Sequence, residues 1–184
     1  MCPLCCSAIL PEEGHEEYCE FRQTECRHSN CKWIGSVKDL LVHYEQKHQI
    51  LYNFQNPVHL SGCFYVTKTE DSTSEMLLFK NNLFWIIFHR NPTGKFITQK
   101  FYYLPTRKPT HLYFFITSFN KGDIEFTSTS MSITDTCADK LALESSEAGV
   151  MIPDAMLDRL LEDKLYLNYN IKIVEIEIND SDDS

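Results

Sequence analysis

The sequence predicts a mainly β protein, in which an antiparallel β-sandwich follows a small metal-binding domain. Cysteine and histidine are concentrated at the start of the chain: residues 1–48 hold six of the eight cysteines and four of the seven histidines. From about residue 58, short segments rich in Phe, Tyr, Ile, Val and Thr follow one another between turn residues, as is typical of a sandwich. A chain of 184 residues has room for one ordinary core and a small satellite domain.

The Cys/His-rich segment is too short to bury a core of its own, so it needs a bound metal ion or another cross-link to fold. A secreted disulfide scaffold would spread its cysteines through the fold and would not need histidines among them. Mixed Cys/His ligation is typical of structural zinc sites. We therefore expect a zinc-binding domain at residues 1–49.

The pattern Cys26-x4-Cys31-x11-His43-x4-His48 predicts one zinc site. The two cysteines can lie on a tight turn, and the two histidines lie at the end of a helix expected over residues 37–48. Four protein ligands complete a tetrahedron and leave no position for water, so this zinc is expected to be structural.

A second set of ligands precedes the first. His15 and Cys19 can share one face of a short acidic helix over residues 12–20. The upstream pair is ambiguous, because Cys2 with Cys5 and Cys2 with Cys6 both have feasible spacings. Two structural zinc ions are therefore expected in all.

The rest of the chain is predicted to form strands, with one helix over residues 153–163 that Pro153 would open. Residues 171–178 alternate apolar and polar side chains over most of their length, as a strand with one wet face does. Trp85 is expected in the core. The acidic tail at residues 179–184 is expected to be disordered. The predicted strands are 62–67, 75–79, 83–88, 96–104, 111–119, 124–133 and 165–178.

Charge and composition exclude several functions. The net charge is −9, and residues 1–48 carry five Lys/Arg against eight Asp/Glu, so binding to nucleic acid is disfavoured. No apolar run approaches the length of a membrane span, and the N-terminus lacks the layout of a signal peptide, which favours a cytoplasmic or nuclear protein. The sequence shows neither a nucleophile elbow nor a phosphate loop, so we predict no catalytic residues.

Three sequence segments are similar to those of a known family: Cys6-Ser-Ala-Ile-Leu-Pro11, His15-Glu-Glu-Tyr-Cys19-Glu-Phe-Arg and Cys31-Lys-Trp-Ile-Gly-Ser. They resemble the double zinc finger of the seven-in-absentia (Sina/SIAH) family of E3 ubiquitin ligases. The spacing from Cys31 through His43 to His48 matches the family's second finger, although the loop after Cys26 is two residues shorter. The resemblance implies Cys2, Cys6, His15 and Cys19 as ligands of the first zinc, with Cys5 as the alternative.

The resemblance extends through Thr106-Arg-Lys108, residues 111–119 and residues 149–161. It implies that residues 50–178 form a TRAF-like β-sandwich that binds substrates and dimerises. Family members carry a RING domain ahead of the fingers. The cysteines of this chain are used by its two zinc sites, so no RING fits within it and no autonomous ligase activity is expected.

By this resemblance, the chain is expected to be a substrate-recognition module that assists or competes with a complete ligase. Its partners would be a second copy, or a RING-containing relative, and proteins with a degron similar to Pro-x-Ala-x-Val-x-Pro. The degron would add as a strand beside residues 75–80, with Met76, Leu78 and Lys80 as contacts. The alternative function is a zinc-finger protein that binds nucleic acid.

Overall fold

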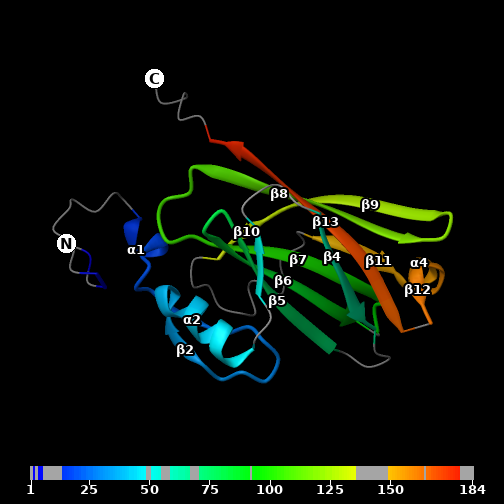
Figure 1. Cartoon of the computed structure of the whole chain (residues 1–184), viewed down its shortest axis with the longest axis horizontal. Coiled ribbons are helices and arrows are strands. Elements are labelled where there is room, and N and C mark those ends of the chain that lie inside the picture. The colour runs from blue at the N-terminus through cyan, green and yellow to red at the C-terminus, as the bar shows by residue number, and fades with distance from the viewer. Residues whose placement is uncertain are drawn as a thin grey trace.

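The computed structural model describes residues 2, 4–5, 14–48, 51–54, 59–66, 71–91, 93–135, 149–163 and 165–178, with the backbone alone at 51–54, 59 and 71. In these residues, two β-sheets stack as a sandwich, and a Cys/His-rich finger region lies against one of them (Figure 1). The predicted mainly β class, with zinc-ligand residues ahead of the sandwich, is confirmed. No helix among the described residues is long and apolar enough to cross a membrane.

The finger region contains one substantial helix. The side chain of Ser36 starts this helix by accepting a hydrogen bond from the Asp39 amide at 3.2 Å. The helix predicted at residues 37–48 is confirmed, whereas only one turn of the expected acidic helix forms in the described part of residues 12–20. The elements of the region are α1 (His15–Tyr18), β1 (Gln23–Glu25), β2 (Ile34–Ser36) and α2 (Val37–Lys47).

The sheet that contacts the finger region, here called the finger-side sheet, has the order β10-β7-β6-β5-β3, with β11 also paired to β7. Most pairs are antiparallel, but β3–β5 and β10–β7 are parallel. Its strands are β3 (Leu51–Phe54), β5 (Asp71–Phe79), β6 (Asn82–Asn91), β7 (Phe96–Leu104), β10 (Ile133–Thr134) and β11 (Val150–Pro153).

The second sheet, here called the far sheet, is antiparallel and has the order β12-β13-β8-β9, with β4 on the other side of β13. Helix α4 (Asp154–Leu160) connects the two sheets. It ends earlier than the predicted residue 163, because the next residues pair with the far sheet. The strands are β4 (His59–Tyr65), β8 (His111–Lys121), β9 (Ile124–Met131), β12 (Leu161–Glu162) and β13 (Tyr166–Glu177).

Two apolar clusters cover the finger-side sheet, one on each face. Between the sheets, Phe101 stacks on Phe115 with ring centroids 4.0 Å apart. On the other face, Trp85 is completely buried beneath Tyr44 of α2, which contacts it edge-on at 5.5 Å. A strand covered on both faces needs no polar alternation, which explains the continuous apolar run 83–88 in β6. The prediction that Trp85 belongs to the core is confirmed.

Candidate metal centres

The first candidate centre lies between the loop after β1 and the helix α2. Cys26 follows β1, Cys31 ends a four-residue loop, His43 projects from α2, and His48 caps that helix. The Cys26 Sγ–His48 Nε2 and Cys31 Sγ–His43 Nε2 distances are both 3.4 Å. All four ligand atoms lie within 4.8 Å of one another. The four residues predicted from the sequence therefore come together in one cluster.

The protonation of this cluster suits a cation. Burial lowers the pKa of His43 and of His48, which favours the neutral rings that can offer a lone pair to a metal. Without a metal, burial and the neighbouring Cys31 raise the pKa of the Cys26 thiol to about 12. A zinc ion would stabilise the thiolate form of that side chain.

Aromatic rings shield the ligands from water. Trp33 stacks on His43 with ring centroids 4.5 Å apart, and His28 stacks on His48 at 4.0 Å. Tyr44 contacts His48 from α2 at 4.9 Å. Trp33 also packs against the cluster that holds Trp85, so it lies between the finger region and the sandwich.

The second centre lies at the start of the chain. Cys5 Sγ is 3.4 Å from His15 Nε2, and Cys2 Sγ is 4.0 Å from Cys19 Sγ. These four residues form a cluster of the same kind as the first. Cys5, which was the alternative ligand in the sequence analysis, is the fourth member of this cluster. Cys6 lies outside the described residues.

Both clusters fit zinc. Bonds of about 2.3 Å to sulfur and about 2.0 Å to nitrogen in a tetrahedron place S and N atoms about 3.5 Å apart, and two S atoms about 3.8 Å apart. The observed separations of 3.4 and 4.0 Å match these values. Each cluster supplies four ligands, so each would hold a structural zinc ion and leave no open coordination position for water or substrate.

The structure places the three predicted peptide contacts in different surroundings. Met76 and Leu78 are 0% and 8% exposed and belong to the cluster beneath α2. Lys80 is exposed at the end of β5, where it forms an ion pair with Glu175 of the far sheet. The expectation that a degron adds directly beside residues 75–80 is wrong for Met76–Phe79, because this stretch is paired with β3 on one side and with β6 on the other.

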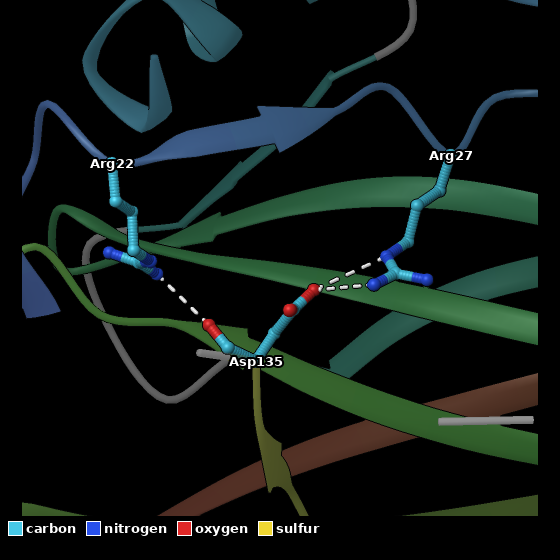
Figure 2. A network of polar contacts seen from close by, with 3 residues as sticks. All are labelled: Arg22, Arg27 and Asp135. Carbon is cyan, nitrogen blue, oxygen red and sulfur yellow. Dashed lines mark hydrogen bonds and ion pairs between the residues drawn. The ribbon is translucent and has the colours of Figure 1, made fainter. Parts of the chain in front are cut away.

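An arginine pair that sequence reasoning missed holds the finger region on the sandwich (Figure 2). Arg27 donates from Nε and Nη2 to Asp135 Oδ2 at 3.2 and 2.8 Å, and these side chains are only 6% and 3% exposed. Arg22 donates to the backbone oxygens of Asp135, at 2.9 Å, and of Pro105. The burial of Arg27 cannot be read from the sequence, and nothing near Arg27 in the sequence points to a partner 108 residues away.

Comparison with known proteins agrees with this geometry. The family model described as "Sina, zinc finger" matches residues 2–60, which include both clusters. Putative E3 ubiquitin-protein ligase SINA-like 9 of Arabidopsis thaliana is 27% identical over 87% of this chain and 59% of its own length. SINA-like 6 of the same plant is 26% identical over 47% of this chain and 31% of its own.

The chain thus spans about three fifths of the first of these relatives and about a third of the second. The similarity to the first reaches beyond the fingers, because 87% of this chain is aligned. The ligand spacing, the two four-residue clusters and the family match agree with one another. Residues 2–60 of this chain thus match the Sina zinc-finger family, and most of the chain is similar to a SINA-like protein.

Proposed function

We propose that the chain is a substrate-recognition module of a Sina-type ubiquitin ligase system, acting in the cytoplasm or nucleus. The names of its relatives connect it to ubiquitin ligases. Zinc sites with four protein ligands favour a structural role for the metal over a catalytic one. A finger region packed on a sandwich suits a binding module.

The observation that carries the proposal is the edge of the finger-side sheet. Among the described strands, β3 is the last of this sheet and is paired on one side only, with β5. A strand with an unpaired edge offers backbone N–H and C=O groups to an extended segment of another protein. We propose that a degron adds beside β3. Met76 and Leu78 would then support the edge from the neighbouring strand.

Calorimetric titration with a Pro-x-Ala-x-Val-x-Pro peptide and a scrambled control tests this function. We expect sequence-dependent binding in the micromolar range. Strand addition also predicts an alternation: methylating every second backbone nitrogen of the peptide should abolish binding, and methylating the intervening ones should be tolerated. Equal binding of the scrambled peptide, or no binding, would argue against degron recognition.

We also propose that the far sheet mediates pairing, with a second copy or with a RING-containing relative. Its outer face carries apolar side chains at paired positions of β8, β9 and β13. Leu112, Met131 and Ile176 are 43%, 50% and 51% exposed. An exposed apolar patch of this kind is typical of an interaction surface. The face includes Leu112, Phe114, Ile116, Met131, Val174 and Ile176.

Light scattering of the purified chain tests this pairing. We expect a dimer whose dissociation constant rises roughly tenfold or more when Ile176→Lys places a charge in the patch. Met151→Lys is the matched control, because Met151 is 56% exposed on β11 of the other sheet. An equal effect of the two substitutions, or a monomeric parent chain, would contradict pairing through this face.

A further inference from the structure

One zinc-ligand cluster lies directly before the edge strand β3 in the chain. This cluster, here called the helix centre, consists of Cys26, Cys31, His43 and His48. His48 caps α2 and β3 begins at Leu51, so only two residues separate a ligand from the strand that would receive a degron. A zinc ion held by the helix centre would therefore fix the start of β3.

Strand β3 depends on an anchor of this kind. It is only four residues long, Leu51–Phe54, and among the described strands it pairs with β5 alone. A short strand with one neighbour is marginal, because few ladder hydrogen bonds offset the entropy lost when its backbone is ordered. Holding one end of the segment in place lowers that entropy cost. We therefore expect β3 to detach from β5 more readily when His48 is released.

The loop between the two cysteines of the helix centre supports β5 as well. Ser29 Oγ donates a hydrogen bond to the Ser72 carbonyl at 3.2 Å, and Ser74 Oγ donates one to the Arg27 carbonyl. Further along β5, the side chains beneath α2 are covered by that helix, which carries the two histidine ligands. The helix centre thus supports both strands that form the proposed degron-binding edge.

A groove gives small molecules access to the two cysteines. Its volume is about 580 Å³, and Cys26 and Cys31 line it together with residues of β5, β6 and β7. Cys31 is half-buried, whereas Cys26 is 5% exposed. Their sulfur atoms lie within 4.8 Å of each other, which is close enough for a disulfide to form after a small movement of the loop. An oxidant as small as hydrogen peroxide can therefore reach this pair.

We propose that the helix centre is an oxidation site, at which a hydroperoxide converts Cys26 and Cys31 to a disulfide and so stops degron binding at β3. The more exposed thiolate, that of Cys31, attacks a peroxide oxygen, forms a sulfenic acid and displaces hydroxide. The Cys26 thiolate then attacks the sulfenic sulfur and displaces a second hydroxide. With hydrogen peroxide, the two hydroxides take up two protons, so the two electrons lost by the sulfurs reduce one peroxide to two waters.

The inference rests on the proposed function and adds a control to it. Oxidation removes two of the four ligands, so the helix centre loses its metal and His48 no longer holds the start of β3. A thiol reductant together with zinc restores the centre, because thiol–disulfide exchange is reversible. The chain therefore recognises degrons only under reducing conditions.

Titration of the full zinc-loaded chain with hydrogen peroxide tests the inference. We expect a metallochromic indicator to detect the release of one zinc ion per chain, and mass spectrometry of peptides to find a Cys26–Cys31 disulfide. Amide hydrogen exchange should rise at Leu51–Phe54 and stay unchanged in the paired stretches of β8 and β13. The affinity for the Pro-x-Ala-x-Val-x-Pro peptide should fall roughly tenfold or more, and should return when dithiothreitol and zinc are added.

Two cysteine variants assign the effect to the helix centre. Cys63→Ser is the matched control: Cys63 is an exposed thiol on β4, outside both clusters, and this variant should respond to peroxide as the parent chain does. Cys31→His replaces the exposed thiolate by another zinc ligand, and it should keep its zinc at peroxide concentrations that empty the parent. Should Cys31→His fail to hold zinc, the disulfide found in the parent chain still decides which cysteines react.

The outcomes separate this inference from the proposed function. A reduced chain that does not bind the peptide, with peroxide still raising exchange in β3, would reject degron recognition and retain the oxidation site. Zinc that stays bound after Cys63 has been oxidised, or a disulfide that does not join Cys26 to Cys31, would reject the oxidation site. Zinc release with unchanged exchange in β3 would reject its control of the edge.

Discussion

Removing zinc is expected to unfold the finger region and to expose the outer face of the finger-side sheet, while the sandwich keeps its β-structure. Structural zinc contributes on the order of 10–16 kcal/mol of apparent binding free energy, and this energy is available only in the folded finger. The two tryptophans of the chain, Trp33 and Trp85, both pack in the contact between finger and sandwich. We therefore expect a strong chelator to shift tryptophan emission to the red, to remove the helical signal of α2, and to open residues 14–48 to protease.

A pair of histidine variants separates ligation from packing. His43→Ala removes a zinc ligand, so the metal content should fall from two ions per chain to one. His28→Ala is the matched control: His28 stacks on His48 but is not in either ligand cluster, and this variant should keep both ions. If a chelator left emission and protease resistance unchanged, the closed-site interpretation would be wrong.

The zinc centres could be predicted from the sequence because their geometry is local. A four-residue loop fixes the distance between Cys26 and Cys31, and one helix fixes His43 relative to His48. The choice between Cys5 and Cys6 could not be made in this way. Adjacent residues have almost the same spacing to every other ligand, and only the backbone path of the turn decides which thiol points inward.

The strands could also be predicted, but their neighbours could not. Composition and turns identified the segments that form β4 to β9 and β13. They contained no information that β3 pairs in parallel with β5, or that α2 covers Met76 and Leu78. Alternation indicates which residues share a face, whereas what covers that face depends on contacts between distant segments.

The largest single-residue effect outside the zinc ligands is expected at Asp135. Asp135→Ala would leave the Arg27 guanidinium buried without its carboxylate, since Arg27 donates two hydrogen bonds to Oδ2. Removing one partner of a buried ion pair costs about 3–5 kcal/mol, because the remaining charge is desolvated and uncompensated. We expect the free energy of unfolding, measured in urea, to fall by that amount.

Two further variants show whether the cost arises from the buried charge. Glu20→Gln breaks an exposed pair with Lys38, whose N–O distance is 3.9 Å and whose side chains are 54% and 44% exposed. Such a pair contributes about 0–1 kcal/mol, so this control should change stability little. The double variant Arg27→Met/Asp135→Leu removes both charges and should recover most of the stability lost in Asp135→Ala. A cost at Asp135 no larger than at Glu20, or no recovery in the double variant, would mean that other contacts hold the finger region on the sandwich.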